Sequence, residues 1–91
     1  MSTIVLPSKF NFGYHKNFTD QYGKALESAP SKAITLDFSN VEYLDSAALG
    51  MMVLLKKKAD AQNTEVTIIN AHGAALDVLK IANFQNLFSI K

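Results

Sequence analysis

The chain contains no cysteine, and this absence excludes a disulfide framework, a thiolate metal site and a cysteine nucleophile. It also lacks a long hydrophobic run. The longest apolar stretch, residues 47–55, has nine residues, whereas about 20 are needed to cross a bilayer. Residues 1–7 have neither the charged segment nor the apolar run of a signal peptide. These absences predict a cytoplasmic protein with no direct membrane insertion.

The chain also has little excess charge. Nine basic and eight acidic residues leave a net charge of +1, so no electrostatic preference for nucleic acid or anionic membrane follows. Apolar residues make up 48% of the 91 positions, which is typical of a globular chain that can bury one core. We therefore expect a single domain over residues 1–91 that does not bind nucleic acid.

Hydrophobic periodicity predicts strands and helices that alternate along the chain. Strands are expected at 3–6, 9–12, 33–38 and 65–69, helices at 16–28, 47–59 and 73–81, and a last turn with an edge strand at 84–90. Residues 41–44 are interpreted as a short apolar approach to the second helix, which Asp45 and Ser46 open. Strands separated by helices imply crossover connections and a largely parallel sheet. We predict an α/β fold with a mostly parallel sheet of four to five strands, covered by a layer of helices.

Ser46 is the strongest candidate for a chemical role. Asp45 and Ser46 precede a long run of helix-forming residues, and the free N–H groups of a helix N-terminus stabilise an anion. A phosphate on Ser46 would be tolerated there and would add about −1.5 to −2 charges. The residues alone leave a second interpretation open, in which Ser46 is only a helix cap.

The helix after Ser46 is apolar on almost every side. Ala48, Met52, Leu55 and Ala59 form one stripe that can face the sheet, while Leu49, Val53 and Leu54 lie on other faces. Such a helix is either buried on several sides or presents an apolar patch to a partner. The sequence favours neither.

Other chemistry has no readable pattern. His15 and His72 have no metal-ligand neighbour at i+3 or i+4, and the four glycines form no phosphate-binding loop. No acid–base pair and no nucleophile elbow are present. We therefore predict no catalytic residue, no metal site and no cofactor.

One long segment resembles the STAS domain, in particular the bacterial anti-sigma factor antagonists. It runs from Ile34 to Gly50 and reads ITLDFSNVEYLDSAALG. The later stretch VLKIANFQNLFSI, residues 78–90, is similar to the closing helix and strand of that family, and residues 10–18 resemble the second strand and the entry to the first helix. The resemblance implies a STAS-like α/β fold.

The resemblance also implies a partner-switching mechanism. An unphosphorylated family member binds an anti-sigma factor or a kinase-like regulator, phosphorylation of the serine after the aspartate releases it, and a serine phosphatase restores it. By this resemblance Ser46 is the phosphoacceptor. The partner-binding surface is then made by Asp45, Ser46, Ala47, Leu49, Gly50 and Val53. Relatives often carry a second Ser or Thr at position 47 and Gly at position 48, where this chain has alanines.

Two other functions are weighed against this one. Some STAS proteins are non-catalytic accessory subunits of membrane transport complexes, and in that case Ser46 would be a cap and the apolar helix face a permanent interface. A phospho-receiver domain needs paired acidic residues after an early strand and a lysine after a late one, and the chain has neither.

Overall fold

The computed structural model describes residues 2–27 and 33–91. In chain order the elements are β1 (Ser2–Val5), β2 (Lys9–Phe10), the 3-10 turn η1 (Phe12–Tyr14), α1 (His15–Glu27), β3 (Ala33–Asp37), β4 (Tyr43–Leu44), α2 (Ser46–Ala61), β5 (Glu65–Ile69), α3 (Gly73–Ile81), the 3-10 turn η2 (Phe84–Asn86) and β6 (Ser89–Ile90). The predicted α/β fold with a mostly parallel sheet is confirmed.

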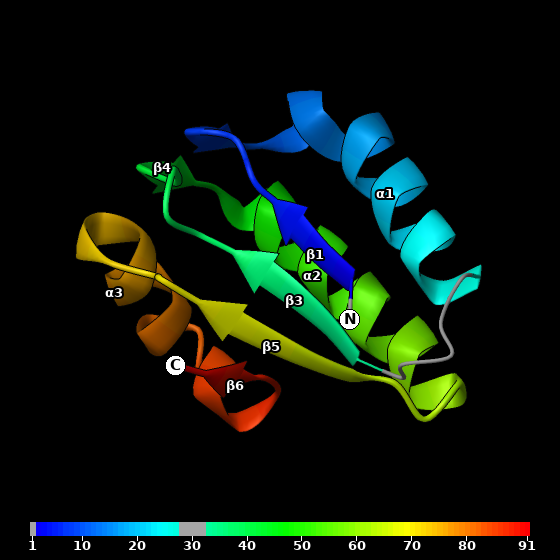
Figure 1. Cartoon of the computed structure of the whole chain (residues 1–91). Helices are drawn as coiled ribbons and strands as arrows, with labels where there is room; N and C mark the ends of the chain where they lie inside the picture. The colour runs from blue at the N-terminus through cyan, green and yellow to red at the C-terminus, as the bar shows by residue number, and fades with distance from the viewer. Residues whose placement is uncertain (1, 28–32) are drawn as a thin grey trace.

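The main sheet has four parallel strands in the order β1-β3-β5-β6 (Figure 1). Each successive strand is added on the same side of the one before it. Because β-crossover-β connections are right-handed, this order places every connecting helix on the same face of the sheet. Figure 1 shows α2 behind the sheet and α1 beside β1. Phe18 and Tyr22 of α1 and Ala75 and Leu79 of α3 belong to the same core as α2. The helices therefore form one layer, as predicted.

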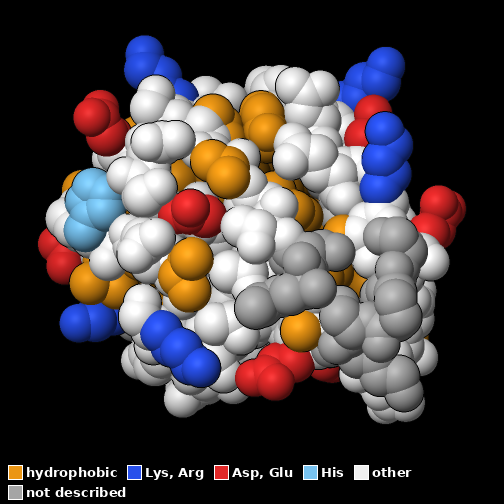
Figure 2. Space-filling model, viewed as in Figure 1, with side chains coloured by type: hydrophobic (Ala, Val, Ile, Leu, Met, Phe, Trp, Pro, Cys, Tyr) orange, Lys and Arg blue, Asp and Glu red, His pale blue; other side chains and the backbone are white. Residues whose placement is uncertain are grey.

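The two faces of the sheet carry different side chains. Ile34, Leu36 and Ile68 are fully buried against the helices. The alternate residues point the other way, and the strand register aligns Thr3, Thr35, Thr67 and Ser89 in one row across all four strands. No helix among the described residues covers this open face, which Figure 2 shows from the front.

Two short strands, β2 and β4, form a separate parallel pair. Phe10 lies beside Leu44 in this pair. It is fully buried, and its ring lies 5.1 Å from that of Phe18 and 6.4 Å from that of Phe38, measured between ring centroids. This aromatic contact fixes β2 and β4 against α1 and the end of β3, and β4 leads directly into α2.

The sequence interpretation needs three corrections here. The predicted strand at 9–12 ends at Phe10, because the Asn11 side chain accepts a hydrogen bond from Gly13 N (2.9 Å) and starts a 3-10 turn. Residues 43–44 of the predicted apolar approach are a strand, which adds β4 to the expected order. The predicted helix at 16–28 begins one residue earlier, and its predicted last residue, Ser28, lies outside the described residues.

The C-terminus of α2 is closed by a Schellman motif around Asn63. Thr64 N donates to Ala59 O (2.8 Å) and Asn63 N donates to Asp60 O (3.2 Å), the two hydrogen bonds that define the motif. Asn63 has a φ of 55°, in the left-handed region that glycine and asparagine tolerate best. This turn sends the chain into β5.

Substitutions at Asn63 test this turn. Asn63→Ala should lower the free energy of unfolding by about 1 kcal/mol, because alanine has neither the freedom of glycine nor a side chain suited to φ > 0. Asn63→Gly should leave stability unchanged or raise it by a few tenths of a kcal/mol. Urea unfolding of both variants measures the difference, and equal stabilities would show that the turn does not constrain position 63.

Candidate functional site

Asp45 is the N-cap of α2. Its backbone is extended, with φ −112° and ψ −178°, and its Oδ1 accepts a hydrogen bond from Ala48 N at 2.9 Å. Its carbonyl accepts the helical hydrogen bond from Leu49 N at 3.1 Å. A cap residue satisfies one of the N–H groups that the helix itself cannot pair. The interpretation of Ser46 as the cap is therefore wrong, since Asp45 fills that position.

Ser46 is the first residue of α2, and its side chain is exposed. Within residues 2–27 and 33–91, the Ser46 hydroxyl makes no hydrogen bond or other polar contact. An enzyme can therefore reach the hydroxyl from solvent without breaking a native interaction. A phosphate placed there would lie beside the N–H groups of the first turn and the positive end of the helix dipole.

α2 has a buried face and an outer face. The buried face contains the predicted stripe, Ala48, Met52, Leu55 and Ala59, with Met51 in addition. The opposite side, which we call the outer face, is made by Ser46, Gly50, Val53 and Leu54, at the spacing of one helical face. Leu54 is 52% exposed, whereas Val53 and the flanking Leu49 are half-buried against the core. The sequence left open whether α2 is buried on several sides or keeps an apolar patch exposed. The structure shows some of each, since one face is buried and Leu54 on the outer face is exposed.

Gly50 lies in the middle of the outer face and has no packing reason to be glycine. A Cβ built on Gly50 meets no atom within 4 Å, so alanine would fit without strain. Glycine inside a helix costs about 1 kcal/mol relative to alanine. The isolated chain therefore gains nothing from glycine at position 50, and the same holds for Gly23 in α1, where an added Cβ also meets no atom within 4 Å.

Two loops beside the sheet are joined by Asp37, at the carboxyl end of β3. Its Oδ1 accepts hydrogen bonds from Ser39 N (2.9 Å) and from Asn70 Nδ2 (3.2 Å), and these donors, the Ser39 backbone first, hold the pKa of Asp37 below its ordinary value. His72 Nε2 lies 3.1 Å from Ser39 O. The β3–β4 loop, which leads to Ser46, is thus attached to the loop before α3.

The sequence interpretation missed two exposed apolar side chains in this part of the molecule and left a third out of the predicted site. Tyr43 lies in β4, and Phe12 lies in η1, where it stacks on the His15 ring with 4.9 Å between centroids. Leu54, which was placed outside the buried stripe but not in the predicted site, lies on the outer face, at helical spacing from Ser46 and Gly50. The exposure of Phe12 could not be predicted, because it depends on the short turn that Asn11 starts.

Among the predicted site residues, Ser46 and Gly50 are exposed, while Asp45, Ala47, Leu49 and Val53 are partly buried. All of them lie on the first two turns of α2 or at its cap. In the described ranges no group of three or more metal-ligating side chains comes together. None of the described helices is both long and apolar enough to span a bilayer.

Comparison with known proteins identifies the fold and the family. The STAS domain profile matches residues 2–91. A STAS-domain containing protein of Pseudomonas aeruginosa is 35% identical over 88 residues, which are 97% of this chain and 85% of that protein. The match covers nearly the whole chain, so the chain belongs to the STAS domain family, as the resemblance implied.

Three solved structures share the fold at low identity. A candidate anti-sigma factor antagonist of Thermotoga maritima superposes with a TM-score of 0.81 at 22% identity, over 97% of this chain and 77% of that one. The anti-sigma factor antagonist SpoIIAA in its unphosphorylated form gives 0.74 at 15% identity, over 98% and 76%. A sulfate transporter family protein of Wolinella succinogenes gives 0.77 at 13% identity, over 93% and 68%.

The cap assignment predicts different effects for two adjacent residues. Asp45→Ala should lower the free energy of unfolding by about 1 kcal/mol, because it leaves Ala48 N without its acceptor. Ser46→Ala should change it by less than about 0.5 kcal/mol, because the hydroxyl makes no contact. Urea unfolding of the two variants checks this, and a larger loss for Ser46→Ala would contradict the assignment.

Proposed function

We propose that this chain is an anti-sigma factor antagonist that acts as a partner-switching protein, controlled by phosphorylation of Ser46. The observation that carries the proposal is the exposed Ser46 hydroxyl at the first position of α2, in line with an outer face that is apolar and partly uncovered. The unphosphorylated chain binds an anti-sigma factor or a kinase-like regulator through this region. The chain has no catalysis of its own, and ATP and magnesium belong to the kinase.

The electrostatics of the site explain how phosphorylation would release the partner. Asp45 already carries one negative charge beside Ser46, and its carboxylate is held by Ala48 N. Phosphoserine adds about −1.5 to −2 more. A partner surface built to meet an uncharged hydroxyl and an apolar strip would then face a concentrated negative charge, and like or uncompensated charges at an interface cost several kcal/mol. The fold itself need not change, because the Ser46 side chain is exposed and makes no polar contact among the described residues.

Partner capture from the native cell tests the role of Ser46. Ser46→Asp should weaken binding of the captured anti-sigma factor at least about tenfold, because it places a permanent charge at the interface. Ser46→Ala should bind like the wild type and should not gain the mass of a phosphate when incubated with the partner and ATP. Calorimetric titration and intact mass measure the two effects, and wild-type affinity in Ser46→Asp would refute the switch.

Gly50 offers a second, independent test with a matched control. Gly50→Gln should raise the free energy of unfolding by about 0.5 kcal/mol, because glutamine is the better helix former, and should weaken partner binding at least about tenfold by blocking the close approach. Gly23→Gln in α1 makes the same change at a glycine that also has no atom within 4 Å of an added Cβ. It should stabilise the chain equally and leave binding unchanged. Equal binding by both variants would remove Gly50 from the interface.

A constitutive accessory subunit of a membrane transport complex is the alternative function, and the likeness in fold to a sulfate transporter family protein favours keeping it. In that case the outer face of α2 is a permanent interface. The same capture experiment separates the two functions. Isolation as an obligate complex with a transport ATPase, with no phosphate on the chain in cells, would support the alternative.

A further inference from the structure

Two loops at the carboxyl edge of the main sheet are joined to each other by side chains. The β3–β4 loop covers residues 38–42 and leads toward Ser46, and the β5–α3 loop covers residues 70–72. In Figure 1 the arrowheads of β3 and β5 point toward the end that holds β4 and α3. A backbone contact starts the junction, since Phe38 N donates to Ile69 O at 2.9 Å.

Asn70 has a backbone conformation that glycine could adopt and a side chain that glycine could not replace. Its φ is 61°, in the left-handed region, and its Nδ2 donates to Asp37 Oδ1 at 3.2 Å. Asn63 and Asn83 also have positive φ values, 55° and 61°, but neither side chain makes a hydrogen bond within the described part of the chain. Backbone conformation therefore accounts for those two asparagines, whereas the amide of Asn70 has a distant partner.

His72 directs its side chain to the same loop. It occupies the N-cap position of α3, yet its side chain makes no capping hydrogen bond. Its Nε2 lies 3.1 Å from Ser39 O instead, and the imidazole donates there because a carbonyl oxygen only accepts. Ser39 N in turn donates to Asp37 Oδ1 at 2.9 Å. We call the contacts of Asn70 and His72 with Asp37 and Ser39 the loop bridge.

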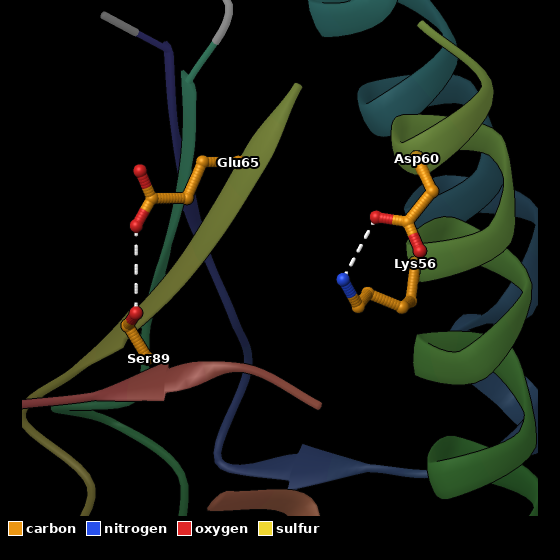
Figure 3. A network of polar contacts seen from close by, with 4 residues as sticks. All are labelled: Lys56, Asp60, Glu65 and Ser89. Carbon is orange, nitrogen blue, oxygen red and sulfur yellow. Dashed lines mark hydrogen bonds and ion pairs between the residues drawn. The ribbon is translucent and has the colours of Figure 1, made fainter. Parts of the chain in front are cut away.

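Two other polar contacts connect parts of the molecule that are already joined. Figure 3 shows them near a pocket of about 640 Å³ at the start of β5. The ion pair of Lys56 and Asp60, at 2.7 Å, lies within α2. The contact of 3.4 Å from Ser89 Oγ to Glu65 Oε1 joins β6 to β5, which also pair through their backbones. The loop bridge differs from both, because it connects segments that lead to different elements.

The elements to which the bridged loops lead are in contact with each other. α3 packs against β4, and β4 runs directly into the cap of α2 and Ser46. β4 is only two residues long and pairs with the equally short β2. Residues 39 and 40 are exposed between the buried Phe38 and Val41, so apolar packing does not hold the tip of the β3–β4 loop. The loop bridge supplies the contacts that hold it.

We propose that Asn70 is a positioning residue for Ser46, which acts through Asp37 and the β3–β4 loop. The loop bridge holds the tip of this loop against the start of α3. It thereby fixes β4 and the direction in which the chain enters α2. The functional consequence rests on the proposed phosphorylation of Ser46, whereas the positioning is a property of the isolated chain. Release of the bridge lowers the rate at which a kinase modifies Ser46, although Asn70 makes no polar contact with that residue.

An exchange of two side chains tests the bridge. Asn70→Asp keeps a residue that tolerates positive φ but places two carboxylates at hydrogen-bond distance, where they repel each other. The double variant Asp37→Asn/Asn70→Asp has the net charge of the wild type. In it the amide at position 37 can accept from Ser39 N and donate to the carboxylate at position 70. Asn83→Asp is the matched control, because it makes the same substitution at the same φ without a side-chain partner among the described residues.

Amide hydrogen exchange of the isotope-labelled chain, followed by nuclear magnetic resonance, measures the positioning. In Asn70→Asp the amides of Ser39, Tyr43 and Ala48 should exchange at least about threefold faster, in line with the loss of one hydrogen bond. The increase should exceed that of the β5 amides, which report on global unfolding. The double variant should return the rates to those of the wild type, and Asn83→Asp should leave them unchanged.

Phosphorylation by the captured kinase-like partner with ATP, followed by intact mass, measures the consequence. For Ser46, kcat/KM should fall at least about fivefold in Asn70→Asp, because a small misplacement of a reacting group is costly. It should recover in the double variant and stay unchanged in Asn83→Asp. A structural role of Asn70 alone would lower stability but would leave kcat/KM for the folded chain unchanged.

Four results would overturn the inference. The first is unchanged exchange at Tyr43 and Ala48 in Asn70→Asp, and the second is a double variant that does not restore the rates. The third is an equal effect of Asn83→Asp, which would reduce the effect to added charge. The fourth is faster exchange with an unchanged kcat/KM. If the wild type is not phosphorylated at all, the proposed switch fails, and the exchange rates still decide whether Asn70 positions the start of α2.

Discussion

The right-handedness of the crossover connections determines on which face of the sheet the helices of this small domain lie. Because the strands are added in one direction, β1-β3-β5-β6, the three helices are forced onto one face and share one core. Because the four strands are parallel, their carboxyl ends lie at the same edge of the sheet. The β3–β4 loop, β4 and the start of α2 gather at that end, and so Ser46 is placed where ligands and partners of parallel sheets usually bind.

At the start of α2, Asp45 and Ser46 differ in their structural roles. Asp45 completes the helix by accepting the hydrogen bond from Ala48 N, which leaves the Ser46 hydroxyl free of any stabilising role. The proposed phosphorylation of Ser46 would therefore require no native hydrogen bond of the described residues to break. At Gly50 the residue present does not favour stability, since the isolated chain would be more stable with alanine at this position.

Much of this organisation could be predicted from the sequence, because long periodic segments signal their own structure. The bounds of β5 and α3 agree with the pattern, and the buried stripe of α2 was visible from its spacing. Strand β4 was missed because two residues carry no periodicity, and its formation depends on the contact between Phe10 and distant aromatic rings. The pattern could not decide between Asp45 and Ser46 as the cap, since both are favoured N-cap residues.

The pocket of about 640 Å³ at the start of β5 was also beyond prediction. Its lining combines residues 63–66 with residues 85–89. These two segments are distant in sequence, and the hydrophobic pattern of neither one shows that they meet.

The row of hydroxyls on the open face has a consequence for how the molecule behaves at high concentration. Parallel sheets are normally covered on both faces, and an uncovered one rich in β-branched residues would invite stacking between molecules. Thr3, Thr67 and Ser89 keep the β-branched or compact shape that suits a strand while offering hydroxyls that can bind water, and Thr35, which is buried, continues the row between them. The row places polar side chains across the middle of the uncovered side of this two-layer domain, which reduces the apolar area that a second molecule could cover there.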